Sequence, residues 1–358
     1  MYCEIERSPF KKSLKHLQKL LPTSSTRFTL EPGPSGLSLT GSHGSTWIQL
    51  PVPGTIDGAD LVELPPPTAA ALARGRRRWC HLSREGGLLT IDGEPTSPHP
   101  VSIPRPARPT FHATSATELS APDLHRALHE VVRSISRDDT RYGLNGVFLE
   151  VLPSPRRLRL VGSDGHRLHW SELFLADPLA PPARKLLPRA VAELLVSTLP
   201  RQDALTVSLA FSAEAVCVRA GGLHIQVPMQ DGEFPNYRVL AQVKEPRWKL
   251  TLDVPQTIAA LKTLHPLTRK TNTVGLRVAD NTACFQADDG ETQRAEFVPV
   301  KLDGDPLQTG FNPQYLLDVL NVARTDRVSL AMAGELDPCS IHVVGRPDCH
   351  FVVMPVRL

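Results

Sequence analysis

The fold is decided by one stretch near the middle of the chain, Val161-Gly162-Ser163-Asp164-Gly165-His166-Arg167-Leu168. Before it, from Arg157 to Leu160, charged and apolar residues alternate with the two-residue period of a strand. Asp-Gly is a frequent turn dipeptide, and a second strand-like run follows from His169 to Leu173. We therefore predict a β-hairpin whose corner carries a polar His-Arg pair beside an apolar Leu.

The hairpin belongs to a pattern that occurs three times. Each version begins with a helical stripe, in Phe10–Leu21, Leu124–Ile135 and Ile258–Leu264. Strands and a polar corner follow, at Gly41–Gly44, Asp164–Gly165 and Asp288–Gly290. A second helix is expected at Thr68–Ala73, Arg189–Leu199 and Pro313–Ala323. The repeat of roughly 110 residues predicts an α+β protein of three similar domains, residues 1–112, 113–243 and 244–358, with the first the most diverged.

Composition limits the class of protein. With 358 residues and 41% apolar content, the chain is expected to form several domains. No apolar run reaches the roughly 20 residues of a membrane span, so we expect a cytoplasmic protein. The proline-rich segment 94–109 is expected to be an exposed, extended connector. The six cysteines show no metal-binding spacing, and we expect them to be reduced and buried.

A catalytic site is conceivable at Ser163, Asp164 and His166, which would make the protein a hydrolase. Residues this close on one corner rarely converge as nucleophile, base and orienting group. The sequence contains neither a nucleophile elbow nor a phosphate-binding loop. The Asp288-Asp289 pair is typical of a turn rather than of a metal site. We therefore expect no catalytic residues, no metal and no cofactor.

Basic residues recur on the first helix of each repeat. They are Lys12, Lys15 and Lys19 in the first, Arg126 and Arg133 in the second, and Lys262 followed by Arg269 and Lys270 in the third. Each set alone is typical of a solvated helix face. Their recurrence favours a continuous surface that follows DNA phosphates without reading bases, because the net charge of +3 is too small for attraction by the whole molecule.

Apolar residues near the signature segments suggest a groove. They are Leu144, Leu168, Val239, Leu336, Val352, Val353, Met354 and Val356, fringed by His166, Arg167, Arg238 and Arg357. For strand residues such as Val352 a place in the core is equally consistent with the pattern. Met354 before Pro355 favours a groove, because proline ends strand pairing and a flexible thioether suits an adaptable peptide pocket.

Four segments together resemble one known family. In chain order they are Arg141–Val147, Val161–Leu168, Asp231–Arg238 and Phe351–Leu358. They are similar to the bacterial replicative sliding clamp, the β subunit of DNA polymerase III, closely from Glu118 to Leu358 and less so before. Gly41-Ser42-His43 stands where that family usually has Thr-Asp, and Gly143 replaces a larger residue.

The resemblance implies a fold and a function. The fold would be three clamp-type domains, each with two helices on one side of antiparallel sheets, in a head-to-tail homodimer that forms a closed ring. The ring would encircle duplex DNA at the nucleoid without sequence preference and bind DNA polymerase and clamp-loader subunits through short Leu-Phe-type peptides. An alternative is a divergent paralogue that acts as a peptide-binding scaffold or decoy, as an accessory or drug-resistance copy.

The resemblance also assigns site residues. The implied peptide pocket comprises Leu144, Ser163, Gly165, His166, Arg167, Leu168, Pro235, Arg238, Val239, Leu336, Pro338, Val352, Val353, Met354, Pro355, Val356 and Arg357. The implied DNA-facing loops add Ser24, Ser25, Arg27, Arg141, Tyr142, Arg189, Arg269 and Lys270 to the basic helix residues.

Overall fold

The structure of the chain is a computed structural model. The structure describes all residues except 23–25, 35, 58–60, 86–87, 99–106, 153–155, 182–184, 242 and 244, and all their side chains except those of 27, 85, 97, 98 and 241. The chain divides into two compact units. Unit 1 comprises Met1–His125 and Leu175–Gln230, and unit 2 comprises Arg126–Phe174 and Asp231–Leu358.

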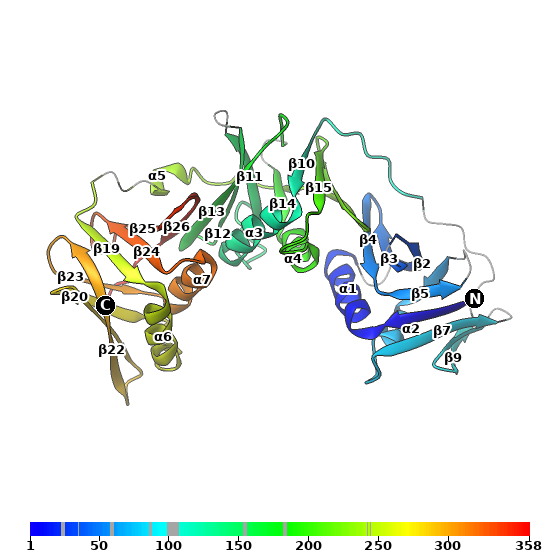
Figure 1. Cartoon of the computed structure of the whole chain (residues 1–358), viewed down its shortest axis with the longest axis horizontal. Coiled ribbons are helices and arrows are strands. Elements are labelled where there is room, and N and C mark those ends of the chain that lie inside the picture. The colour runs from blue at the N-terminus through cyan, green and yellow to red at the C-terminus, as the bar shows by residue number, and fades with distance from the viewer. Residues whose placement is uncertain are drawn as a thin grey trace. The chain divides into compact units, whose positions relative to one another are not determined.

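One order of elements occurs three times along the chain (Figure 1): a strand, a helix, several strands, a second helix and three strands. The first set is β1(Tyr2–Glu6), α1(Arg7–Leu20), β2(Arg27–Gly33), β3(Gly36–His43), β4(Thr46–Val52), β5(Gly54–Asp57), β6(Val62–Leu64), α2(Pro66–Leu72), β7(Trp79–Glu85), β8(Leu88–Ile91) and β9(Glu94–Pro98). The second is β10(Ser115–Ser120), α3(Ala121–Val131), β11(Gly146–Leu152), β12(Arg157–Ser163), β13(Arg167–Phe174), β14(Lys185–Pro188), α4(Arg189–Thr198), β15(Thr206–Phe211), β16(Ala215–Ala220) and β17(Leu223–Pro228).

The third set completes the pattern. It is β19(Trp248–Asp253), α6(Val254–Leu264), β20(Val274–Ala279), β21(Thr282–Asp288), β22(Gln293–Asp303), β23(Leu307–Phe311), α7(Pro313–Ala323), β24(Arg327–Met332), β25(Cys339–Val343) and β26(Arg346–Val353). Between the second and third sets lie β18(Gln230–Asp231) and the short helix α5(Arg238–Ala241). The α+β class, the six predicted helices and the central hairpin are therefore confirmed. The limits of the three domains stay a prediction.

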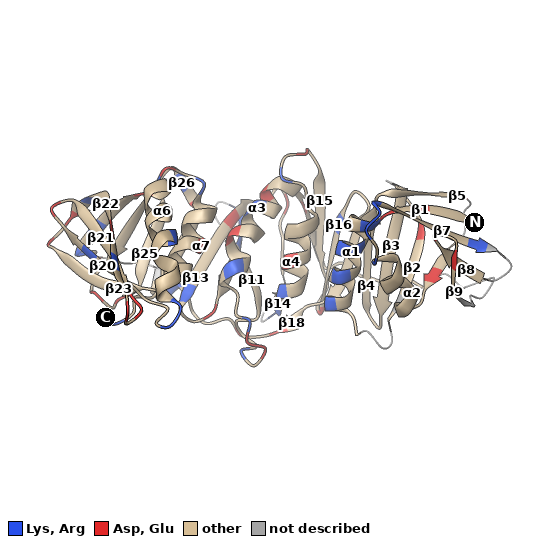
Figure 2. Ribbon diagram, turned by 90° about the horizontal axis from the view of Figure 1, so that it is seen from below, with Lys and Arg blue, Asp and Glu red and all other residues tan. Residues whose placement is uncertain are grey.

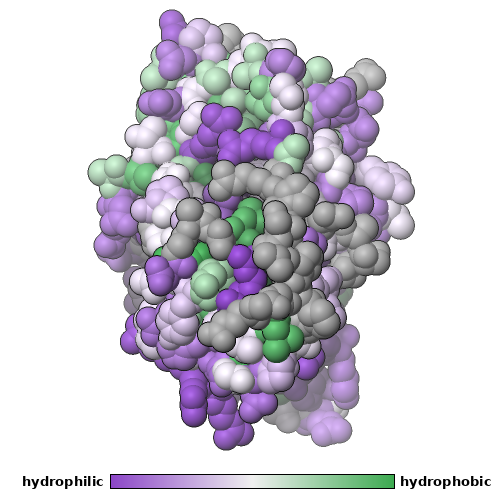
Figure 3. Space-filling view, turned by 90° about the vertical axis from the view of Figure 1, so that its right-hand side faces the viewer, coloured by the Kyte–Doolittle hydropathy of each residue, from purple (hydrophilic) through white to green (hydrophobic). Residues whose placement is uncertain are grey.

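Unit 1 contains two antiparallel sheets. Their strand orders are β5-β1-β7-β8-β9 and β10-β15-β16-β17-β4-β3-β2-β6. Helix α1 packs against β3 and β4, and its buried Phe10, Leu14 and Leu17 form the apolar stripe that the sequence predicts. Described residues on the face of unit 1 shown in Figure 3 are mainly hydrophilic, with hydrophobic ones in small separate areas.

Unit 2 contains the strands in the order β11-β12-β13-β26-β25-β24-β19-β22-β21-β20-β23. Helices α6 and α7 pack together on its core. Each begins at a side-chain cap, because Asp253 accepts a hydrogen bond from the Gln256 amide and Asn312 accepts one from the Gln314 amide. The central β13–β26 pairing brings the hairpin of the second repeat beside the last strand of the chain.

Two expectations need correction. The segment 94–109 is not an extended connector throughout, because Glu94–Pro98 forms β9 and pairs with β8. As the last strand of its sheet, β9 tolerates proline, which cannot donate a ladder hydrogen bond. All six cysteines are free, but Cys284 is only partly buried. No helix among the described residues is both long and apolar enough to cross a membrane.

Candidate functional site

The Asp164-Gly165 corner is closed by a side chain. The Asp164 Oδ1 accepts hydrogen bonds from the backbone amides of His166 and Arg167, at 3.0 and 3.1 Å. Gly165 has a φ of +90°, a conformation that side chains other than that of glycine rarely adopt. The Asp-Gly dipeptide therefore fixes the end of β12 and the start of β13.

Arg167 links this corner to the C-terminal repeat. Its guanidinium donates to Asp164 Oδ2 at 3.0 Å and to Asp318 Oδ2 of α7 at 2.5 Å, and it lies over the Tyr315 ring. Burial would raise the pKa of Asp318, but hydrogen bonds and charge from Arg167, with further donors from Gln314 and Arg133, lower it below the usual value. Asp318 is therefore held as a carboxylate.

An apolar pocket of about 160 Å³ opens at this hairpin corner, entirely within unit 2. It is lined by Leu144, Ser163, Gly165, Arg167, Leu168, Phe234, Pro235, Tyr237, Leu240, Val352 and Met354. Three of its lining residues, Leu168, Tyr237 and Val352, form a buried apolar cluster with Val161. Leu168 pairs with Val352 across β13 and β26, so both side chains lie on one face of the sheet.

Next to the lining residues Leu144 and Phe234, the backbone approaches closely at Gly143. A Cβ placed there would lie 2.5 Å from the Glu233 carbonyl oxygen, a contact that no larger residue makes without a shift. Leu144 is held next to it by a hydrogen bond from its amide to the Arg141 carbonyl. The absence of a side chain at Gly143 therefore lets the Glu233 backbone pack against this loop.

The predicted pocket residues separate into two groups. The structure brings together eight of them around the apolar pocket: Leu144, Ser163, Gly165, Arg167, Leu168, Pro235, Val352 and Met354. The remaining nine, His166, Arg238, Val239, Leu336, Pro338, Val353, Pro355, Val356 and Arg357, do not line it. Val353 is fully buried in the core of unit 2, because successive strand residues face opposite sides of the sheet.

Several of the nine residues are sequence neighbours of residues that line the pocket. The His166 carbonyl accepts the Met354 amide, which holds the C-terminal segment against the hairpin. Val356 forms an isolated bridge with Gly310. Val239 and Leu336 are exposed.

Three residues that line the apolar pocket were not predicted from the sequence: Phe234, Tyr237 and Leu240. Phe234 and Tyr237 are marked in the sequence only as members of the Asp231–Arg238 segment. Leu240 is marked only as part of the apolar pair Val239-Leu240 that follows this segment.

The hydrolase alternative finds no support in the arrangement of the corner. The Ser163 hydroxyl donates to the Arg167 carbonyl at 2.8 Å, and the Asp164 carboxylate is used by the turn and by the Arg167 guanidinium. In this described segment no hydrogen bond joins the His166 imidazole to the Ser163 hydroxyl or to the Asp164 carboxylate, to which His166 donates only its backbone amide. Among the described residues there is also no cluster of three potential metal ligands.

The predicted DNA-facing side chains of unit 1 that the structure describes lie on α1 and at the start of α4. Figure 2 shows Lys and Arg positions along α1. The Lys12 ammonium donates to the Ser197 carbonyl at 2.8 Å, while Lys15 is exposed. Lys19 and Arg189 both pair with Glu193 of α4, at 3.6 and 2.8 Å. Ser24, Ser25 and the Arg27 side chain lie outside the described part of the chain.

In unit 2 the basic residues differ in their surroundings. Arg126 pairs with Asp348 at 2.6 Å and Arg133 with Asp318 at 3.1 Å, so both also hold the fold together. Arg141 donates to the Asp164 carbonyl at 2.7 Å and thereby braces the hairpin corner. Tyr142, Arg269 and Lys270 are exposed. Arg141 is exposed as well, so these four side chains of the predicted DNA-facing set are accessible in this unit.

Comparison with known proteins gives a consistent result. The family model described as "DNA polymerase III beta subunit, central domain" matches residues 118–236, and its C-terminal-domain counterpart matches residues 244–357. The Beta sliding clamp of Pseudomonas aeruginosa is 30% identical over 239 residues, which is 66% of this chain and 64% of that protein. The Beta sliding clamp of Haemophilus influenzae is 29% identical over 247 residues, 67% of this chain and 65% of that protein.

Solved structures show the same fold over the whole chain. The DNA polymerase III beta subunit of Thermotoga maritima matches with a TM-score of 0.81 at 20% identity, and the sliding clamp of Pseudomonas aeruginosa with ligand matches with 0.80 at 24%. The clamp of Bartonella birtlesii bound to griselimycin matches with 0.80 at 20%. Each comparison covers 100% of both chains.

A thrice-repeated α+β order of elements and an apolar pocket at an Asp-Gly hairpin corner define a clamp-type fold. The two family models together match more than half of the residues. The chain belongs to the family of the bacterial DNA polymerase III beta subunit, the sliding clamp.

Proposed function

We propose that this protein is a DNA sliding clamp, a non-catalytic subunit that encircles duplex DNA as a homodimeric ring and tethers a DNA polymerase to its template. One observation carries the proposal: the apolar pocket formed by Leu168, Val352 and Met354 at the Asp164-Gly165 corner. Apolar side chains around a small cavity suit the anchors of a short peptide. Family membership supports the same function.

The mechanism needs no bond to be made or broken. A closed ring leaves DNA only by opening, so processivity follows from topology. Exposed cations such as Lys15, Arg269 and Lys270 would contact phosphates through interactions that are weak, screened by salt and independent of sequence. The partner enzymes would carry the chemistry and dock by their peptides, in the cytoplasm at the nucleoid.

Two measurements test the proposal. Size-exclusion chromatography with light scattering is expected to give about twice the monomer mass of 39.2 kDa. After loading by a clamp loader, the protein should stay on closed circular DNA and be released when the circle is linearised, because a ring slides off a free end. A strict monomer at micromolar concentration, or equal release from both DNA forms, would refute the ring.

A further inference from the structure

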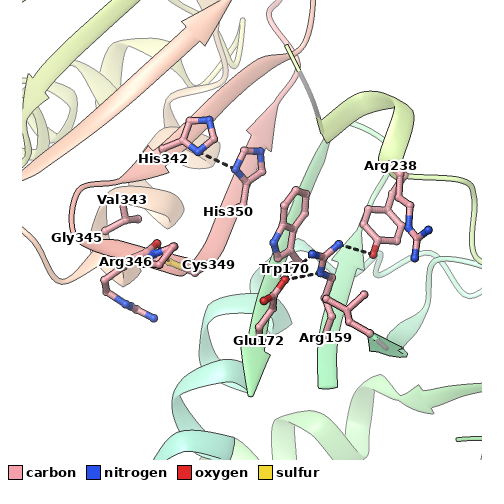
Figure 4. A pocket seen from close by; sticks show the side chains of 13 residues that line it. Arg159, Trp170, Glu172, Arg238, His342, Val343, Gly345, Arg346, Cys349 and His350 are labelled. Carbon is pink, nitrogen blue, oxygen red and sulfur yellow. Dashed lines mark hydrogen bonds and ion pairs between the residues drawn. The ribbon is translucent and has the colours of Figure 1, made fainter. Parts of the chain in front are cut away.

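The sheet face that lines the apolar pocket continues into a second, larger hollow of about 880 Å³, also within unit 2. We call this hollow the polar pocket, and its principal side chains are Arg159, Trp170, Arg238, His342, Arg346 and His350 (Figure 4). Apart from Arg238, none of these residues belongs to the predicted peptide pocket. Tyr237 lines both pockets, so it forms the boundary between them.

Strand register explains why the two pockets adjoin. Leu168 pairs with Val352 in the apolar pocket, and two residues further along the same strands Trp170 pairs with His350. His342 lies opposite His350 on β25. Residues two apart on a strand face the same side, roughly 7 Å from one another. The polar pocket is therefore the next row of side chains on a single surface.

The aromatic and imidazole side chains of the polar pocket contact one another. Trp170 stacks on His350 with ring centroids 4.1 Å apart, and the Arg159 guanidinium lies 4.9 Å from the Trp170 ring centroid. The two histidine Nδ1 atoms are 3.1 Å apart, and the Ser340 hydroxyl contacts both Nε2 atoms, at 3.2 and 3.0 Å. Figure 4 shows the histidine pair facing the Trp170 and Arg159 side. A ligand would therefore meet preorganised groups.

Charge decides which ligand fits. Glu172 accepts from both Arg157 and Arg159, at 2.7 and 2.5 Å, so two guanidinium groups share one carboxylate. In the ion pairs with Arg159 and with Arg238 the carboxylate is the less exposed partner: Glu172 is 7% exposed against 17% for Arg159, and Glu150 is 18% exposed against 61% for Arg238. Arg346 is held by Glu130 and Asp348, so Arg238 is the guanidinium most open to a ligand among these arginines. Such a surface attracts an anion, and a planar guanidinium matches a carboxylate.

We propose that the polar pocket binds an acidic side chain of the same partner peptide whose apolar residues fill the apolar pocket. This inference rests on the proposed function. An extended peptide advances roughly 3.3 Å per residue, and the two pockets lie one or two side-chain rows apart. The acidic residue is therefore two to four positions from the apolar anchor. It adds affinity and orients the peptide, because only one chain direction places it over the arginines.

The test compares matched peptides on the full-length protein by fluorescence polarisation. Each peptide carries the core Gln-Leu-Ser-Leu-Phe, with Glu or with Gln placed before or after the core, two to four positions from its nearest apolar residue. For one of the two flanks we expect the Glu peptide to bind roughly three- to tenfold more tightly than its Gln counterpart, as partly exposed charged contacts allow. The ratio should shrink at high salt.

A pair of variants assigns that ratio to the polar pocket. Arg238→Gln should bring the Glu-to-Gln affinity ratio close to one. The control Arg247→Gln removes a guanidinium of nearly the same exposure, 60%, that pairs with Asp305 outside the pocket, and it should keep the ratio. Equal affinities of Glu and Gln peptides on both flanks, or an undiminished ratio in Arg238→Gln, would overturn this inference. Failure of every peptide to bind would instead overturn the proposed function.

Discussion

Arg167 of β13 and Asp318 of α7 form an ion pair of 2.5 Å whose two side chains are only 10% and 9% exposed. The residues are 151 positions apart in the chain. The same guanidinium holds the Asp164 carboxylate of the hairpin corner. The corner that borders the apolar pocket is thus fastened to the C-terminal repeat by one buried cation.

Replacement of either Arg167 or Asp318 should lower the free energy of unfolding. Asp318→Asn takes one of two carboxylate partners from the buried Arg167 guanidinium and leaves it with Asp164, and we expect a decrease of about 3 kcal/mol in the free energy of unfolding. Arg167→Met should cause a similar decrease, measured by urea denaturation. The double variant Arg167→Met with Asp318→Leu should be destabilised by clearly less than the sum, because neither member of this pair is left buried opposite a missing partner. Strict additivity would contradict a coupled pair.

The apolar pocket predicts weaker peptide binding on truncation of its methionine. Met354→Ala should weaken binding of a Gln-Leu-x-Leu-Phe peptide roughly tenfold, since apolar area is no longer buried against the peptide. The dimer should persist. Val344→Ala is a matched control, because Val344 is an exposed apolar residue of unit 2 outside the pocket. Unchanged affinity in Met354→Ala, measured by fluorescence polarisation, would refute the pocket assignment.

The C-terminal residues should act indirectly. Val356 bridges Gly310, and its amide donates to the Gly310 carbonyl at 2.8 Å. Deletion of Val356, Arg357 and Leu358 removes this anchor of the Met354 segment. We expect weaker peptide binding with a faster dissociation rate, measurable by stopped-flow fluorescence, while the midpoint of urea denaturation changes little. A dissociation rate equal to that of the full chain would show that the bridge does not hold Met354.

His169 predicts a pH dependence of stability. Burial lowers its pKa from 6.5 to about 4, so the folded state favours the neutral ring. The stabilisation is complete above pH 6.5 and is lost as the pH falls from 6.5 towards 4, a change of roughly 3 kcal/mol. In His169→Gln the free energy of unfolding should fall less steeply over that range. Parallel curves for the two proteins would exclude this role.

Binding to phosphates predicts an effect on the salt dependence of DNA affinity. Arg269→Gln with Lys270→Gln removes two exposed cations of unit 2. The slope of log affinity for duplex DNA against log salt should decrease by about 0.9 for each phosphate that is no longer neutralised, equally for any DNA sequence. Arg247→Gln serves as the control with one exposed arginine removed elsewhere. An unchanged slope in the double variant would place these residues away from DNA.

The sequence by itself determined the local structure. Interactions between residues a few positions apart in the chain set the alternation around Val161–Leu168, the Asp-Gly corner and the helical stripes. The thrice-repeated order of elements follows from the same local patterns. Eight of the pocket-lining residues were also predictable, because the corner and the last strand carry recognisable motifs.

Only the tertiary structure decided which face each strand residue shows and what lies opposite it. Val352 lines the apolar pocket while its neighbour Val353 is in the core, a distinction set by the pairing of β13 with β26. The Arg167–Asp318 pair and the row of Trp170, His350 and His342 join segments distant in sequence. Their energies depend on register and burial, which no local pattern encodes.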